Sequence, residues 1–255
     1  MISMNNKIKV VFLGTNGWYD SENGHTTCVF IDTKECYIIL DAGSGIYKID
    51  KYITEEKPVF LFLSHLHLDH ISGLHILNKF RLKKGLTIYC YEGGKQYLEA
   101  IINHPYTMPL DQLPYTVSVC ELKQGSHTGF PYLVEWGKLD HPAYCLGYRF
   151  EFGSTTIAFC TDTGYCNTII DLSQGADLLI AECAAKEGQD STSWPHLGPI
   201  DAANAARNSG VKRLALIHFD ADNYDTLDSR KYAEEQAAQI FVNTFSAYDE
   251  MEINI

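Results

Sequence analysis

The feature that most constrains this chain is an apolar run, residues 59–63, followed almost directly by a histidine-rich string. The run, VFLFL, has the length and composition of a strand buried on both faces. After Ser64 come the residues HLHLDH, 65–70, with three histidines and one aspartate. Imidazole and carboxylate groups are the usual ligands of zinc and related divalent ions. A solvated, histidine-rich turn is the alternative, but packing gives no reason for such a string after a buried strand. The sequence therefore predicts a metal site there.

The composition indicates one folded domain spanning all 255 residues, 1–255. Hydrophobic residues make up 45% and charged residues 20%, so the chain can bury a sizeable core. No apolar run approaches the roughly 18 residues of a membrane helix, and the N-terminus lacks the apolar region of a secretory signal. We therefore expect a cytoplasmic protein without a membrane partner. The net charge of −12 makes nucleic acid a less favoured partner, since nucleic acid is usually bound by a basic surface.

Four further predicted strands end beside a side chain that can bind a metal or transfer a proton. These side chains are His141, Asp162, Glu182 and His218, after segments that end at residues 139, 160, 181 and 217. In sheets covered by helices, ligands gather at the carboxyl ends of the strands. If these ends lie side by side, the four groups converge on the histidine-rich turn.

The predicted helices lie mainly in the last third of the chain. Residues 200–208 form one, with Gly210 as its stop, and residues 229–245 are predicted as a long amphipathic helix. An earlier helix is predicted at 71–79, directly after the histidine-rich string. Strands and helices alternate in this last part, which is typical of an α/β protein.

These motifs resemble the metallo-β-lactamase superfamily, and most closely its branch of ribonuclease Z and cyclic phosphodiesterases. The resemblance covers nearly the whole chain, in the family's order. The matching stretches are residues 12–15 (FLGT), 40–43 (LDAG), 63–70 (LSHLHLDH), His141 with 147–148 (GY), 160–163 (CTDT), Glu182, His196 and 216–219 (LIHF). This joint pattern is far more specific than the histidine string alone.

The resemblance implies an α/β fold, a four-layer αβ/βα sandwich in which two mixed sheets are flanked by helices. It also implies two divalent metal ions, with zinc the expected metal and manganese or iron compatible with the same ligands. By position, the implied ligands are His65, His67 and His141 for the first ion, Asp69, His70 and His218 for the second, and Asp162 as the bridge. Asp41 would orient a ligand histidine from behind.

The resemblance also implies residues for the chemistry. A hydroxide shared by the two metals would attack phosphorus. His196 would protonate the leaving group or stabilise the transition state, and Glu182 would orient His196. Asp69 would transfer a proton in addition to binding metal. Residues 197–198 (LG) depart from the serine and threonine of the ribonuclease Z pattern, so the surroundings of His196 differ from those in that enzyme.

Two other departures bear on the substrate. Bacterial ribonuclease Z of the short type carries a long basic arm between the positions of His141 and Asp162. Here only about 20 residues separate them, enough for a hairpin. The cysteine-rich zinc loop of the phosphoribosyl cyclic phosphodiesterases is also missing, because residues 20–27 contain no cysteine. The leading hypothesis is therefore a phosphodiesterase of small or cyclic phosphodiesters.

Three alternatives remain open at this stage. The first is a ribonuclease Z-like tRNA 3′-endonuclease without its arm, and the second is a thioester or lactam hydrolase. The third is a non-catalytic metal-binding protein on the same scaffold, which is disfavoured because no implied ligand is missing. A homodimer is expected only because relatives often form one.

Overall fold

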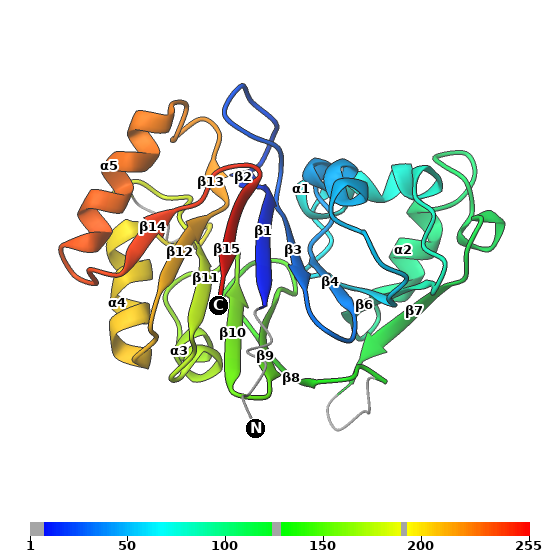
Figure 1. Cartoon of the computed structure of the whole chain (residues 1–255). Helices are drawn as coiled ribbons and strands as arrows, with labels where there is room; N and C mark the ends of the chain where they lie inside the picture. The colour runs from blue at the N-terminus through cyan, green and yellow to red at the C-terminus, as the bar shows by residue number, and fades with distance from the viewer. Residues whose placement is uncertain (1–7, 124–128, 190–192) are drawn as a thin grey trace, which may run out of the picture.

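The computed structural model describes residues 8–123, 129–189 and 193–255. Two mixed sheets lie face to face in its centre (Figure 1). The first sheet contains, in order, β15 (Met251–Asn254), β1 (Lys9–Gly14), β3 (Cys28–Asp32), β4 (Tyr37–Leu40), β5 (Val59–Phe62), β6 (Leu86–Tyr91) and β7 (Val117–Leu122). The second contains β14 (Thr244–Ser246), β12 (Leu214–Ile217), β11 (Leu178–Glu182), β10 (Thr155–Cys160), β9 (Leu146–Phe152) and β8 (Leu133–Lys138). A short ladder joins β2 (Asn16–Gly17) to β13 (Phe219–Asp220).

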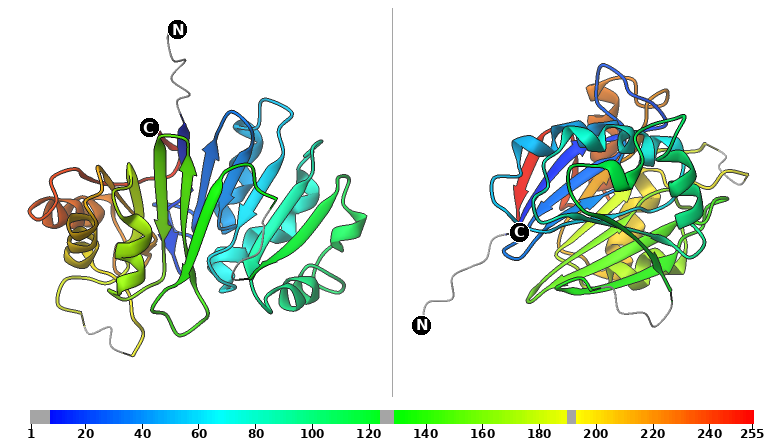
Figure 2. Two further views of the ribbon diagram at one scale, coloured as in Figure 1. Left: turned by 90° about the horizontal axis from the view of Figure 1, so that it is seen from below. Right: turned by 90° about the vertical axis from the view of Figure 1, so that its right-hand side faces the viewer.

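Helices cover the outer face of each sheet, as the views in Figures 1 and 2 show. The helices over the first sheet are η1 (Ser44–Lys51), α1 (Leu68–Ile71), η2 (Ser72–Lys79) and α2 (Lys95–Ile101), where η marks a 3₁₀ helix. Those over the second are α3 (Asn167–Ser173), α4 (Pro199–Ser209) and α5 (Leu227–Ala238). A single 3₁₀ turn, η3 (Leu110–Gln112), lies in the connection between α2 and β7. The four-layer sandwich predicted from the resemblance is therefore confirmed.

Side-chain alternation along the strands builds three separate cores. In β5, Phe60 and Phe62 point into the core between the sheets, whereas Val59 and Leu61 pack under the helices of the first sheet. All four are buried, which confirms the prediction of a strand covered on both faces. The ring of Phe62 lies 5.5 Å from that of Tyr148 in the facing sheet, so the two sheets share an aromatic core.

Parallel pairing puts the ends of several strands at one edge of the sandwich. In the first sheet, Leu40 pairs with Phe62, so β4 and β5 end together. In the second, Cys160 pairs with Ala181 and Glu182 with Ile217, so β10, β11 and β12 also end together. The residues that directly follow these strands therefore face one another across a single edge.

The helix predicted at 229–245 is wrong in its second half. Helix α5 ends at Ala238, and residues 244–246 instead form strand β14, paired in parallel with β12. The sequence after 238 is rich in β-branched and aromatic residues, and pairing at a free sheet edge outweighs its helical periodicity. The predicted helix at 71–79 is only partly α-helical, since η2 begins at Ser72.

The helix predicted at 200–208 corresponds to α4, and its stop at Gly210 is confirmed. Gly210 has φ = 66°, a left-handed conformation that suits glycine at the end of a helix. Within the described ranges, no helix is both long and apolar enough to span a bilayer.

Candidate metal centre

The first group of candidate ligands contains His65, His67, His141 and Asp162. Their ligand atoms all lie within 4.8 Å of one another. The Nε2 atoms of His65 and His141 lie 3.9 and 3.8 Å from Oδ1 of Asp162. Both nitrogens are buried, and neither has a hydrogen-bond partner among the described residues. Because an unsatisfied buried polar atom is costly, two such atoms directed at one carboxylate oxygen fit a cation between them.

The electrostatics of this first group favour neutral imidazoles. Burial lowers the pKa of His65 well below the ordinary histidine value, and the neighbouring His70 adds to that effect. Burial likewise lowers the pKa of His67 and that of His141. Since neutral imidazole is the form that binds a metal, these three side chains are ready to coordinate at neutral pH.

The second group of candidate ligands contains Asp69, His70 and His218, again within 4.8 Å of one another. The Nε2 atoms of the two histidines lie 3.1 Å apart, and each lies 3.4 Å from Oδ2 of Asp69. They also lie 3.0 and 3.2 Å from Oδ2 of Asp162. Asp162 thus turns one oxygen to each group, which is the arrangement that a bridging carboxylate requires.

Carboxylates dominate the electrostatics of this second group. Burial alone would lower the pKa of His218, but Asp162 and Asp69 raise it to about 10. Burial also acts to lower the pKa of His70, but the neighbouring carboxylates, Asp162 first, raise it well above its ordinary value. The two histidines in turn hold the pKa of Asp162 well below the usual range, against the effect of burial. The second group is therefore rich in compensated charge, unlike the first.

Asp41 supports the second group from behind. Its Oδ2 lies 2.7 Å from Nδ1 of His70, and its Oδ1 accepts a 2.7 Å hydrogen bond from the backbone N–H of Ser64. The Ser64 hydroxyl donates to Oδ2 over 2.8 Å. Asp41 is fully buried, so this network fixes the His70 ring with Nε2 directed into the centre.

Backbone strain is concentrated at the same strand ends. Asp41, Asp162 and His218 have φ values of 57°, 51° and 50°, in the left-handed region that non-glycine residues rarely adopt. Each such residue costs about 1–3 kcal/mol and persists only where its surroundings fix it. Trp18, with φ = 71°, lies on the wall of the adjoining pocket. Of the five non-glycine residues with positive φ in the described ranges, four lie at this site.

His196 and Glu182 form a pair beside the second group. Nδ1 of His196 lies 2.7 Å from Oε2 of Glu182, and Glu182 also accepts a hydrogen bond from the backbone N–H of Thr163. Burial would lower the pKa of His196, but the Glu182 carboxylate raises it overall. A ligand nitrogen of His196 lies within 4.8 Å of ligand atoms of Asp162 and His218. The pair can therefore hold a proton next to the centre, or His196 can itself bind a metal.

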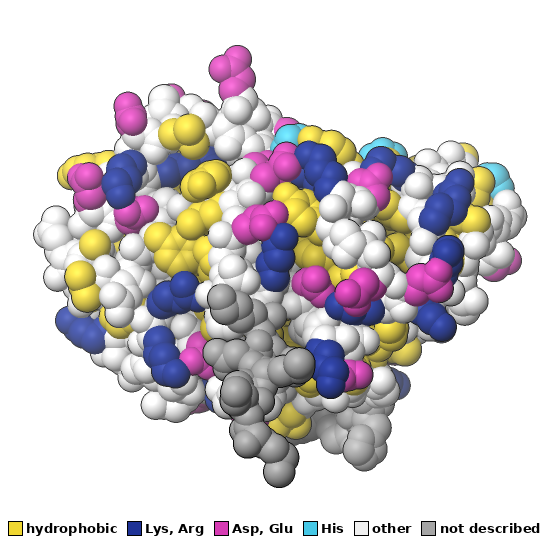
Figure 3. Space-filling view, in the orientation of Figure 1, with side chains coloured by type: hydrophobic (Ala, Val, Ile, Leu, Met, Phe, Trp, Pro, Cys, Tyr) yellow, Lys and Arg dark blue, Asp and Glu magenta, His cyan; other side chains and the backbone are white. Residues whose placement is uncertain are grey.

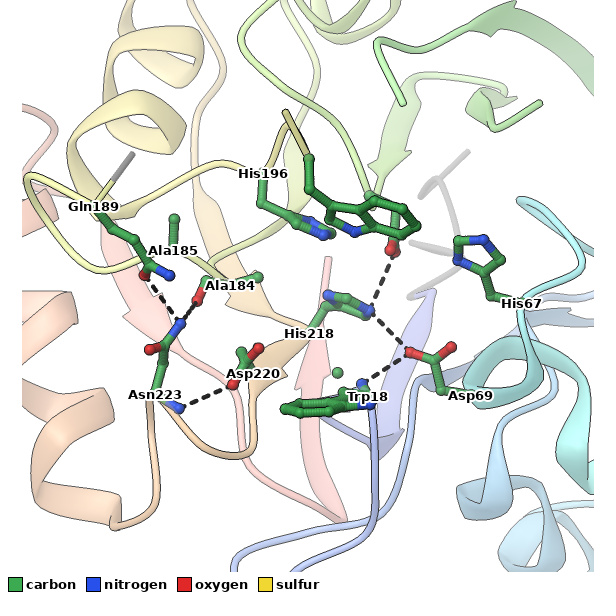
Figure 4. A pocket seen from close by; sticks show the side chains of 13 residues that line it. Trp18, His67, Asp69, Ala184, Ala185, Gln189, His196, His218, Asp220 and Asn223 are labelled. Atoms are coloured by element: carbon green, nitrogen blue, oxygen red, sulfur yellow. Dashed lines mark hydrogen bonds and ion pairs between the residues drawn. The ribbon is translucent and has the colours of Figure 1, made fainter. Parts of the chain in front are cut away.

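A cavity of about 380 Å³ opens onto these groups (Figure 4). It is lined by Gly17, Trp18, His67, Asp69, Asp162, Ala184, Ala185, Gln189, Trp194, His196, His218, Asp220 and Asn223. The backbone N–H of Trp18 donates to Oδ2 of Asp69 over 2.9 Å. The indole of Trp194 stacks on the ring of His67, with centroids 5.9 Å apart and planes 13° apart.

The structure brings all of the sequence-predicted site residues together, but sequence reasoning missed much of the pocket. Trp18, Trp194, Asp220 and Asn223 line it without having been predicted. The turn that leads to Trp18 carried a weak signal, since glycine and asparagine at 14–17 favour a sharp turn. Asp220 and Asn223 carried none beyond their closeness to His218 in the chain.

The fold and this centre define a class, that of metal-dependent hydrolases with two face-to-face sheets. A comparison with family models agrees: residues 37–219 match the beta-lactamase superfamily domain. Since the match covers well over half of the chain, the chain belongs to this family. Its His/Asp cluster is suited to binding metal ions.

Individual relatives extend the match. The chain is 28% identical to the probable metallo-hydrolase YhfI of Bacillus subtilis over 221 residues, covering 83% of this chain and 87% of the relative. It is 26% identical to ribonuclease Z of Metallosphaera sedula, covering 97% of this chain and 99% of the relative.

Two solved structures share the fold. The crystal structure of YhfI has a TM-score of 0.82 at 23% identity and covers 98% of this chain and 100% of its own. That of the short form of human tRNase Z has a TM-score of 0.73 at 22% identity, covering 96% and 98%.

Proposed function

We propose that this chain is a dinuclear metal-dependent phosphodiesterase that acts on a small or cyclic phosphodiester. The observation that carries the proposal is the orientation of Asp162, whose two oxygens face two separate ligand groups. His65, His67 and His141 would hold one ion, and Asp69, His70 and His218 the other, with Asp162 shared. When bound, two divalent ions such as zinc supply Lewis-acid stabilisation of phosphoryl oxygens and lower the pKa of water.

The residues around the ions supply the remaining functions. His196, held by Glu182, is placed to give a proton to the departing oxygen, because the Glu182 carboxylate raises the pKa of His196 and so favours the protonated imidazole. Asp69 accepts a hydrogen bond from the backbone N–H of Trp18, and this bond fixes the Asp69 carboxylate between the second ligand group and the pocket. From there Asp69 can also accept a proton. Asp41 holds His70 in place, is fully buried and does not line the pocket.

Three observations favour a small substrate over precursor tRNA. Between His141 and Asp162 the chain contains only the hairpin of β9 and β10. The alignment with the Metallosphaera ribonuclease Z runs over 301 positions, although this chain has 255 residues, so that relative has segments without a counterpart here. On the face drawn in Figure 3, basic side chains are interspersed with acidic ones, and the net charge is −12.

Ribonuclease activity is the second candidate, because relatives named ribonuclease Z align with nearly the whole chain. One experiment separates the two. Metal analysis of the purified protein should find close to two divalent ions per chain. That preparation should cleave bis-p-nitrophenyl phosphate, lose the activity to a chelator and regain it with zinc or manganese.

Incubation with precursor tRNA is the second arm of that experiment. A phosphodiesterase of small substrates should make no cut at the 3′ side of the discriminator base. If that cut occurs faster than hydrolysis of the small diester, the chain is a ribonuclease instead. If metal-free protein still hydrolyses the small diester, both the metal-dependent phosphodiesterase and the ribonuclease are excluded. Light scattering on the same preparation tests the expected homodimer.

A further inference from the structure

The half of the pocket away from the ligand groups has no role in the chemistry described so far. Figure 4 shows Gln189, Asn223 and Asp220 on the side opposite His67 and Asp69. Asp220 ends strand β13 and pairs with Gly17 of β2, the residue before Trp18. This short ladder therefore sets an acidic side chain and an indole into the same pocket.

The turn that begins at Asp220 fixes its carboxylate, and within the described ranges only one of the two carboxylate oxygens accepts a hydrogen bond. Its Oδ1 accepts hydrogen bonds from the backbone N–H groups of Asp222 and Asn223, both at 2.9 Å. Its Oδ2 has no hydrogen-bond donor among the described residues. Nearby, the Asn223 side chain donates to the carbonyl of Ala184 and to Oε1 of Gln189, at 2.9 and 3.1 Å. This second oxygen can accept a hydrogen bond from a hydroxyl group of a bound molecule.

No lysine or arginine is among the thirteen residues that line the cavity. Arg230 is a buried cation that does not line the cavity, and its guanidinium lies 5.0 Å from the ring of Phe219 in β13. Its Nη atoms are committed to Thr15 and Asn16, at 3.2 and 2.6 Å. A second phosphate on the substrate would therefore meet Asp220 and no lysine or arginine among these lining residues, at a cost in binding.

Two exposed indoles offer flat apolar surface at the same cavity. Trp18 is 66% exposed and Trp194 is 51% exposed, although large aromatic rings are usually buried. Both line the cavity, and the stack on His67 fixes the orientation of Trp194. Such a surface suits a planar ring such as a nucleobase.

We infer that the pocket selects a phosphodiester with a single phosphate and a neutral nucleoside, such as a nucleoside cyclic phosphate. Asp220 is the selectivity residue: it accepts a ribose hydroxyl and rejects a further phosphate, while an indole stacks on the base. The inference rests on the proposed phosphodiesterase function. The reaction needs only water: its oxygen bonds to phosphorus, one phosphorus–oxygen ester bond breaks, and the departing oxygen takes a proton to leave a phosphomonoester and a hydroxyl.

The test uses three substrates with the metal-loaded protein. These are adenosine 2′,3′-cyclic phosphate, the same molecule with an added 5′-phosphate, and bis-p-nitrophenyl phosphate. The first should have a kcat/KM at least tenfold above that of the second. Asp220→Asn should reduce this ratio to below threefold, whereas Asp220→Glu, which keeps the charge, should retain it. Asp222→Asn is the matched control, because Asp222 is exposed and does not line the cavity, and its ratio should equal that of the native protein.

The outcomes distinguish a failure of the proposed phosphodiesterase function from a failure of the charge selectivity. If none of the three diesters is cleaved, the proposed function fails and this inference fails with it. If bis-p-nitrophenyl phosphate is cleaved but the two nucleotides are hydrolysed equally well, the charge selectivity is wrong and the function stands. If the native protein discriminates and a folded Asp220→Asn variant does so equally, Asp220 is not its source.

Discussion

The two halves of the molecule build the site in different ways. The first sheet contributes four candidate ligands from six consecutive residues, 65–70, directly after β5. The second sheet contributes His141, Asp162 and His218 from three separate strand ends, together with the pair of Glu182 and His196. The first contribution depends on local chain geometry. The second depends on the pairing of β8 to β12, antiparallel from β8 to β10 and parallel from β10 to β12, which aligns residues far apart in sequence.

The two ligand groups also differ in charge. Burial leaves the imidazoles of His65 and His141 with low pKa values and unsatisfied Nε2 atoms. His70, by contrast, is compensated by Asp41 and Asp162. Each group draws residues from both halves, so neither sheet alone makes a complete site. Weakening either half should therefore damage the same function.

The largest effect is expected from removing one ligand of either half. His67→Ala and His218→Ala should each reduce kcat/KM for bis-p-nitrophenyl phosphate to below about 1% of native, because an incomplete ligand set holds its ion poorly. Metal content by mass spectrometry should fall with activity. His75→Ala is the control, since His75 is exposed on η2 and outside the pocket. A fully active His218→Ala would remove His218 from the proposed second ligand group.

Replacement of His196 should separate proton transfer from metal binding. His196→Ala is expected to keep both ions and to lose roughly 10²–10⁴-fold in kcat, the usual size of a general-acid contribution. Parallel measurement of metal content and turnover decides the point. Because a nitrogen of His196 lies within 4.8 Å of ligand atoms of Asp162 and His218, loss of metal in this variant would instead make His196 a ligand.

Asp41→Asn should have a smaller effect, confined to the second ligand group. Asparagine tolerates the left-handed backbone and keeps an acceptor for Ser64, but it places an amide N–H₂ group opposite Nδ1 of His70. Metal affinity should fall roughly 10–100-fold, as is typical when the partner of a ligand histidine is lost. Competition with a chromogenic chelator measures it, and unchanged affinity would show that Asp41 only shapes the turn.

The smallest effect is a displacement of the pH profile by Glu182→Gln. The Glu182 carboxylate raises the pKa of His196, so His196 stays protonated to higher pH, and activity that needs this proton falls as pH rises through that pKa. Without the carboxylate the pKa of His196 drops, and the alkaline limb of kcat should move to lower pH. A limb at the native position would show that His196 is not the group that titrates there.

Sequence patterns predicted the fold and the site where the signal was local or matched the family's order. The string 65–70 and the strand before it needed no tertiary information, and α4 carried its own stop at Gly210. The prediction of a helix at 229–245 failed because β14 pairs with β12 in the second sheet, and hydrophobic periodicity along the sequence does not reveal such a contact. The pocket wall escaped prediction for the same reason, since the pairing of Gly17 with Asp220 joins opposite ends of the chain.

By itself the sequence identified a His/Asp cluster suited to binding metal ions, because histidine and aspartate at those spacings after a buried strand have few other uses. It also determined the family, through motifs that keep their order along the chain. Only the tertiary structure decided that Asp162 turns an oxygen to each ligand group and that Asp220 and Trp18 enter one cavity. Such positions depend on how strands pair and where each backbone turns, and these follow from packing of the whole chain.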